Sequence, residues 1–169
     1  MRQQKHGKPE VYANAFWRFS LALYARPGVA EALIALQDRA GNDVNLILFA
    51  LWRGVVHGHR LDQGELTAAE AAIAPLRRDV IEPLRKLRRG LKDNSDPDLQ
   101  ALRRRIGGLE LAAERRAQSR VAATIAAPGA AEDRAAAAAA NLALYLGATA
   151  QSAEAAVLRR ALRDFLTRG

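Results

Sequence analysis

The chain has 169 residues, no cysteine, and 26 lysine and arginine residues against 18 acidic ones, which gives a formal net charge of +8. This length suits one compact domain that can bury a core, and the lack of cysteine excludes disulfides. The basic balance favours acidic partners, either an acidic protein surface or nucleic acid. No apolar run follows the basic N-terminus, so we expect a cytoplasmic protein without membrane insertion.

The N-terminal part of the chain predicts a tail followed by an aromatic helix. Residues 1–13 are polar and basic and are expected to form a flexible tail. Asn14 can cap a first helix over 15–25, whose aromatic side chains lie on more than one side. Pro27 then suits the first turn of a second helix that should end at Gly41.

The segment 43–60, DVNLILFALWRGVVHGHR, is the part around which the rest should pack. It is apolar nearly all round, which is typical of a buried helix, and its apolar run is too short to span a bilayer. Asp43 can cap this helix, and the short loop before it predicts an antiparallel hairpin with the second helix. Gly54 and Gly58 would let another backbone come close, although glycine near a helix end also simply helps the helix to stop.

A fourth helix is predicted over 67–91, because Thr67 and Glu70 fit a capping box at its start. Pro75 and Pro83 fall inside this helix. Each proline removes a hydrogen bond and bends the rod, so we expect two kinks or a break near residue 74.

Asp96 can cap a fifth helix that runs to about residue 126 and forms a second, longer hairpin with the fourth. An alanine-rich sixth helix over 130–146 and a seventh over 152–167 complete the pattern. We therefore predict an all-α fold of about seven helices, with two antiparallel hairpins packed around a buried central helix (43–60), plus a C-terminal helical pair. The domain prediction is a tail over 1–13, a helical core over 14–126, and a C-terminal pair over 130–169 packed on or appended to that core.

A basic cluster marks the turn of the long hairpin. Between residues 85 and 105 there are eight basic and three acidic side chains, a local charge of +5. The cluster could grip phosphates or an acidic protein, or it could be two solvated helix faces with pairs such as Glu82 to Lys86. The predicted partner-binding residues are Arg85, Lys86, Arg88, Arg89, Lys92, Arg103, Arg104 and Arg105.

Polar and aromatic residues near the second and third helices form an alternative candidate site. Capping explains Asp43 by itself, and Gln37 and Asp38 could hydrogen-bond across the same corner. A ligand pocket between the first and third helices is the other interpretation. Its predicted lining is Trp17, Tyr24, Gln37, Asp38, Asp43, Asn45 and Trp52.

Catalysis and metal binding have little support in the sequence. His57 and His59 are two residues apart and point away from each other on a helix, and His6 lies in the tail. Acidic residues such as Asp79 and Glu82 lack the density of the aspartate motifs that hold magnesium diphosphate. We find no cysteine nucleophile, Walker loop or serine elbow. We therefore expect no catalytic residues, no metal site and no cofactor, and whether the chain is an enzyme stays open.

The stretch 24–52, YARPGVAEALIALQDRAGNDVNLILFALW, resembles a bacterial family of small conserved proteins, a domain of unknown function. The shared features are the aromatic first helix, the Arg26-Pro27-Gly28-Val29 turn, and Asp43 to Asn45 leading to Trp52. The resemblance covers roughly residues 16–120 and implies no activity.

The leading hypothesis is a non-catalytic helical adaptor or accessory protein that contacts an acidic protein, RNA or the ribosome through the basic hairpin tip. The alternative is a small-molecule-binding protein or enzyme with a pocket between the first and third helices.

Overall fold

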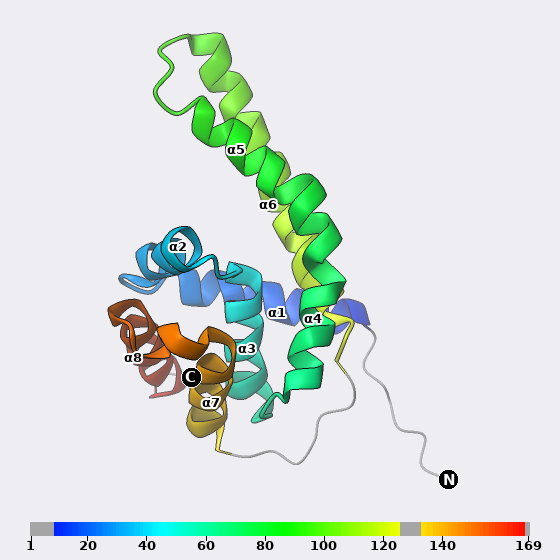
Figure 1. Cartoon of the computed structure of the whole chain (residues 1–169), viewed down its shortest axis with the longest axis vertical. Helices are drawn as coiled ribbons and strands as arrows, with labels where there is room; N and C mark the ends of the chain where they lie inside the picture. The colour runs from blue at the N-terminus through cyan, green and yellow to red at the C-terminus, as the bar shows by residue number, and fades with distance from the viewer. Residues whose placement is uncertain (1–8, 126–132, 168–169) are drawn as a thin grey trace.

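The computed structural model describes residues 9–125 and 133–167, and within these stretches all regular structure is helical (Figure 1). The fourth predicted helix corresponds to α4, η1 and α5 together, so the all-α class and the number of about seven helices are confirmed. The elements in chain order are α1 (Pro9–Tyr24), α2 (Val29–Ala40), α3 (Val44–His57), α4 (Gln63–Leu76), the π-helical segment η1 (Arg77–Ile81), α5 (Glu82–Gly90), α6 (Pro97–Ala122), α7 (Arg134–Leu146), the 3-10 segment η2 (Gly147–Gln151) and α8 (Ala153–Thr167).

Helix α3 is the buried core of the molecule, as its apolar composition predicts. Every residue from 45 to 55 is buried. The ring of Phe16 on α1 stacks on Trp52, with centroids 5.0 Å apart, and meets Phe49 edge-on. The helix ends at His57 rather than at residue 60, because Gly58 takes the left-handed conformation (φ 60°) that closes a helix.

The C-terminal helices pack on this core. Helix α7 is the main neighbour of α3, and a side chain at Gly54 would collide with the α7 backbone at Ala138. The close approach expected at Gly54 is therefore present, whereas Gly58 serves as the helix stop. Ala137 and Ala138 are buried at this contact, so the alanine-rich stretch allows two helix backbones to pack tightly.

The long hairpin forms as predicted. Segments α4, η1 and α5 run antiparallel to α6, and α5 with the first part of α6 extends beyond the other helices (Figure 1). The hairpin therefore projects at an angle from the helical body, the part of the molecule that contains α1, α2 and α3 (Figure 1).

The start of α4 differs from the prediction. Asp62 and Glu65 form the capping box: Asp62 Oδ1 accepts from the Glu65 amide at 2.8 Å, and Glu65 Oε2 accepts from the Asp62 amide at 3.0 Å. Thr67 lies inside the helix, where its hydroxyl donates to the carbonyl of Gln63. Both residue pairs have the spacing of a capping box, and the burial of Leu61 just before Asp62 anchors the earlier one.

The proline-containing rod is continuous rather than broken near residue 74. The π-helical segment joins α4 to α5 without a gap, between Pro75 and Pro83. A proline ring clashes with the carbonyl four residues earlier, which for Pro83 is Asp79, inside the wider π turn. The local change of helix type therefore accommodates the proline.

Three further predictions are corrected. Helix α2 does not form an antiparallel hairpin with α3; it lies across one end of α3 and packs mainly against α8 (Figure 1). Gly41 adopts φ 69°, and this left-handed residue turns the chain sharply. Helix α1 begins at Pro9, so residues 9–13 are helical and Asn14 is not a cap. Helix α6 ends at Ala122; residue 126 lies outside the described residues.

Across residues 9–125 and 133–167, no single helix is long and apolar enough to cross a bilayer. Residues 13–24 and 29–40 pass such a test together on length and composition, but a bend of 102° separates them. Each segment also contributes side chains to the protein core: Phe16 and Leu23 from the first, and Leu33 from the second.

Candidate functional site

A cleft of about 870 Å³ lies between the helical body and the hairpin. Helices α1, α2 and α3 line one side, and α5 and α6 line the other. The cleft brings together residues from both candidate sites of the sequence analysis. Its lining includes, from the predicted pocket, Trp17, Tyr24, Gln37, Asp38 and Asn45, and from the basic cluster, Arg85, Arg88, Arg89, Lys92 and Arg103.

The walls of the cleft carry large apolar side chains that stay open to solvent. Leu21 and Ile34 on the body are 51% and 49% exposed, and Leu111 on the hairpin is 56% exposed. Trp17 and Leu48 extend this apolar lining. Single exposed leucines are common on proteins, but a concave group of them is typical of a binding site.

The floor of the cleft is a chain of polar side chains that links four helices. Ser20 donates to Gln118 Oε1 at 3.1 Å, and Gln118 donates to Asn45 Oδ1 at 3.2 Å. Asn45 in turn donates to Glu114, which also receives Arg85 Nη2 at 2.6 Å. Such connected networks hold the positions of their members because each partner restricts the next.

Glu110 anchors the hairpin side of this network. Its carboxylate accepts from Arg85 Nε at 3.0 Å and from Arg88 Nε at 2.5 Å, while only 8% of Glu110 is exposed. Burial would raise the pKa of Glu110, but the hydrogen bonds and charges of Arg88 and Arg85 outweigh it and lower that pKa. Glu110 is therefore a carboxylate at neutral pH, and it neutralises part of the basic cluster.

Glu114 sits in a different electrostatic environment four residues later. Burial raises its pKa, and the hydrogen bond from Asn45 and the charge of Arg85 only partly oppose this effect. Burial and the charge of Glu114 also raise the pKa of the nearby Tyr24 phenol. Burial raises and arginine lowers the pKa of both glutamates, but arginine outweighs burial at Glu110 whereas burial prevails at Glu114, so the net shifts are opposite.

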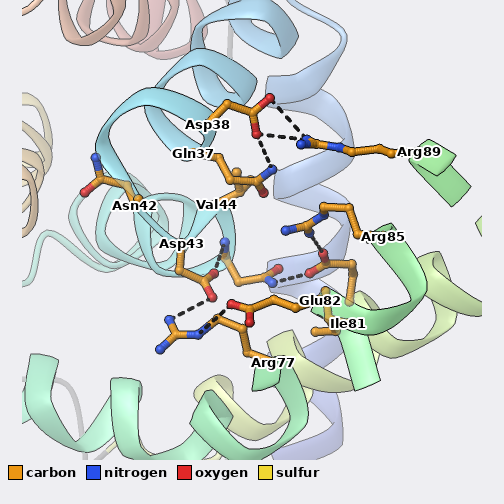
Figure 2. Close-up of a pocket in the computed structure, with 13 residues that line it drawn as sticks. Gln37, Asp38, Asn42, Asp43, Val44, Arg77, Ile81, Glu82, Arg85 and Arg89 are labelled. Carbon is orange, nitrogen blue, oxygen red and sulfur yellow. Dashed lines mark hydrogen bonds and ion pairs between the residues drawn. The ribbon is translucent and has the colours of Figure 1, made fainter. Parts of the chain in front are cut away.

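The mouth of the cleft is bridged by Asp38 and Arg89, which come from α2 and α5. Arg89 Nη2 lies 2.8 Å and 3.1 Å from the two carboxylate oxygens of Asp38 (Figure 2). This contact lowers the pKa of Asp38, and Gln37 also donates to the same carboxylate at 3.2 Å. Gln37 and Asp38 therefore hydrogen-bond to each other, and Asp38 reaches α5 rather than across the corner to α3.

A smaller polar recess of about 430 Å³ adjoins the cleft (Figure 2). Asp43 lines this recess rather than the larger cleft. Its Oδ1 caps α3 through the Asn45 amide at 2.8 Å, which confirms the capping interpretation, and its Oδ2 lies 3.2 Å from Arg77 Nη1. Glu82 pairs with Arg77 at 3.9 Å and not with Lys86.

Two cationic side chains of the cleft keep their donors unused. Lys92 and Arg103 make no side-chain hydrogen bond or ion pair with any residue that the structure describes, and Arg103 Nε is buried without an acceptor. The other three basic residues of the cleft are paired with Asp38, Glu110 and Glu114. Five cations against three carboxylates leave the cleft with a positive surplus at Lys92 and Arg103.

Not all predicted residues belong to the cleft. Trp52 is fully buried against Phe16 and lines neither recess. Lys86, Arg104 and Arg105 are exposed on other sides of the hairpin. Four further residues of the cleft were not predicted from the sequence: Ser20, Glu110, Glu114 and Gln118. A spacing of four residues places Glu110, Glu114 and Gln118 on one face of α6, and this polar row was the available signal.

The two histidines near the end of α3 take part in separate local contacts. The ring of His57 lies edge-on to Trp52, with centroids 4.7 Å apart, whereas His59 Nε2 lies 2.8 Å from Glu65 Oε1. Within the described part of the chain, no group of three or more potential ligands could hold a metal ion.

Comparison with known proteins adds a family but no activity. A family model described as protein of unknown function (DUF2390) matches residues 15–121. This range contains α3, the hairpin except the last residue of α6, and every residue that lines the cleft. No curated protein and no solved structure matches the chain.

Proposed function

The chain belongs to the DUF2390 family of proteins of unknown function, and we propose that it is a binding protein whose cleft holds an amphiphilic organic anion. The observation that carries this proposal is the combination, in one cleft, of an apolar wall and two cations that pair with no residue among those described. A volume of about 870 Å³ is in the range of roughly 300 to 1,000 Å³ that is usual for small-molecule sites.

The cleft suggests how such a ligand would lie. Lys92 and Arg103 come from the part of the hairpin nearest its turn, so they would receive the anionic head group. Leu21, Ile34 and Leu111 would cover the apolar body. A ligand without an anionic group would leave the buried Arg103 Nε without an acceptor, and a ligand without an apolar body would leave the exposed leucines uncovered; both cost free energy.

The proposed site combines the basic hairpin tip and the ligand pocket, which were alternative predictions from the sequence. The predicted basic cluster supplies the charge, and the predicted pocket supplies the apolar surface. Internal pairing occupies Arg85, Arg88 and Arg89, which weakens the case for a phosphate-gripping tip. An apolar wall beside cations is an arrangement that holds a ligand, so the proposal is for binding.

Trp17 fluorescence tests the proposal, with a Trp17→Phe variant to separate its signal from Trp52. The titrants are decanoate, 1-decanol and decylammonium, each below its aggregation concentration. We expect decanoate to bind about 10-fold more tightly than decanol, a difference of about 1.4 kcal/mol that one charged hydrogen bond can supply. Bound decanoate should also raise the melting temperature.

Matched variants locate the site. Lys92→Gln with Arg103→Gln should remove the advantage of decanoate and leave decanol binding unchanged, whereas Leu111→Gln should weaken both ligands. Arg104→Gln is the control, because Arg104 is exposed next to Arg103 but lies outside the cleft. Equal binding of all three titrants, or an equal effect of Arg104→Gln, would contradict the proposal.

A further inference from the structure

The hairpin carries a second set of exposed leucines, away from the cleft. Leu87 on α5 is 58% exposed, and Leu109 and Leu102 on α6 are 60% and 46% exposed. None of the three lines the cleft or the smaller recess. No residue that the structure describes therefore covers these side chains to any large extent.

The helix period places these leucines on the side of the hairpin opposite the cleft. Leu87 is two residues from Arg89, and Leu109 is two residues from Leu111, and both of these neighbours line the cleft. Two residues turn an α-helix by about 200°, so Leu87 and Leu109 point to the far side.

The register of the two helices brings the leucines into one surface. Arg88 is bonded to Glu110, and its Cδ lies 3.4 Å from the position of a Cβ on Gly107. Leu87 and Leu109 consequently lie at about the same level of the antiparallel pair. Leu102 precedes Leu109 by seven residues, or two helical turns, which is the spacing of a helix-packing seam. We call these three residues, Leu87, Leu102 and Leu109, the outer seam.

Basic side chains flank the outer seam. Arg105 and Arg116 follow Leu102 and Leu109 by three and seven residues, so they share the same face of α6. Both are exposed and make no side-chain contact to an acid within residues 9–125 and 133–167. Asp98, near the turn, is the acidic residue at the end of this face. The edge of the outer seam is therefore positively charged.

We propose that the outer seam is a docking surface for an acidic amphipathic helix of another protein, which would complete a three-helix bundle with α5 and α6. Leucines at heptad spacing fit the apolar face of a third helix, and Arg105 and Arg116 fit its glutamates or aspartates. A second copy of this chain is a poorer occupant, because its outer seam carries the same exposed cations, Arg105 and Arg116, and offers no row of acids to meet them. Nucleic acid would use the arginines but not the leucines.

The inference is independent of the proposed function, since the two surfaces lie on opposite sides of the hairpin. The probe is a synthetic amphipathic helical peptide with leucines at heptad positions and glutamates beside them. Two control peptides have lysines in place of glutamates, or the same composition in scrambled order. Fluorescence anisotropy measures their binding to the full chain, and sedimentation measures the oligomeric state of the chain alone.

We expect the glutamate peptide to bind and the two control peptides to bind at least 10-fold more weakly. Leu102→Gln with Leu109→Gln should weaken the glutamate peptide at least 10-fold, and Arg105→Gln with Arg116→Gln should weaken it and reduce its dependence on salt. Leu111→Gln is the matched control, because it removes an exposed leucine from the cleft side of the same helix. It should affect decanoate and not the peptide.

Several outcomes would overturn the inference. One is absence of glutamate-peptide binding at about 100 μM peptide, a concentration at which even a weak interaction with a Kd of about 10⁻⁴ M would fill half of the sites. A dimer that Leu109→Gln dissociates would make a second copy the occupant. An RNA oligonucleotide that displaces the peptide and binds Leu109→Gln as well as wild type would make the face a nucleic-acid surface. Circular dichroism of each variant checks that the helices remain.

Discussion

The Cα of Ala138 lies 2.3 Å from the position that a Cβ on Gly54 would occupy. No real side chain fits at that distance, so α3 and α7 can pack in this way only with glycine at position 54. Helix α3 is the most buried element of the protein, and α7 is its main neighbour. The contact therefore connects the C-terminal part of the chain to the core that carries the cleft.

Gly54→Ala should destabilise the protein by about 1 to 3 kcal/mol or more, because overpacking forces two backbones apart. Gly108→Ala is the control: a Cβ there meets no atom within 4 Å, and alanine favours a helix over glycine by about 1 kcal/mol. Chemical denaturation measures both. If Gly54→Ala proved as stable as wild type, α7 would not pack on α3 in this way.

Asp43 serves as helix cap and as partner of Arg77, so its substitutions should separate these two roles. Asp43→Ala should cost about 0.5 to 2 kcal/mol for the lost cap, plus whatever the contact with Arg77 contributes. Asp43→Asn keeps an acceptor for the Asn45 amide and should cost less. Urea denaturation of both variants at low and high salt provides the measurement. Equal losses for Ala and Asn would mean that the charge, not the cap, matters.

The stability of Glu110→Gln relative to wild type should depend on pH. The arginines lower the pKa of Glu110 below its ordinary value of 4.5, so its ionised form stabilises the folded state. This contribution is present above pH 4.5 and disappears as the pH falls through the lowered pKa. The destabilisation caused by Glu110→Gln should therefore be largest at neutral pH and shrink towards pH 3, as measured by denaturation across that range.

Glu114→Gln should show the opposite pH dependence. Burial raises the pKa of Glu114, so the folded state takes up a proton before the unfolded chain does. Wild type should therefore gain stability relative to Glu114→Gln as the pH falls from 7 towards 4.5. A parallel pH profile for the two glutamine variants would contradict the different environments of these glutamates.

His57 should make the protein less stable in mild acid. Burial and the positive charges of Arg53, His59 and Arg134 lower the pKa of His57 from 6.5 to about 4. Between these values the unfolded chain binds a proton that the folded chain does not, so the stability should fall as the pH falls from about 6.5 to about 4. His57→Gln should reduce this fall, as measured by denaturation at pH 7 and pH 5. A fall of the same size in the variant would assign it to other groups.

The sequence by itself determined the helices and the buried centre of the protein. The segment 43–60 is apolar nearly all round, which predicts a buried helix. Asp43 and Asp96 cap their helices as expected. These features depend on contacts within one or two helical turns, so local sequence patterns report them. The start of α4 was predicted at the wrong residue. Asp62 and Thr67 are each followed three residues later by a glutamate, so both fit a capping box and the local sequence does not distinguish them.

Only the tertiary structure decided which helices pack together and where the candidate site lies. The pairs of Arg89 with Asp38 and of Arg85 with Glu114 join residues 51 and 29 positions apart. Local periodicity contains no information about such pairs, since each helix face looks solvated until its partner is known. The docking of the hairpin against α1, α2 and α3 turned a basic cluster and a separate polar corner into one cleft. The packing of Phe16 on Trp52 placed this tryptophan in the core instead of in a pocket.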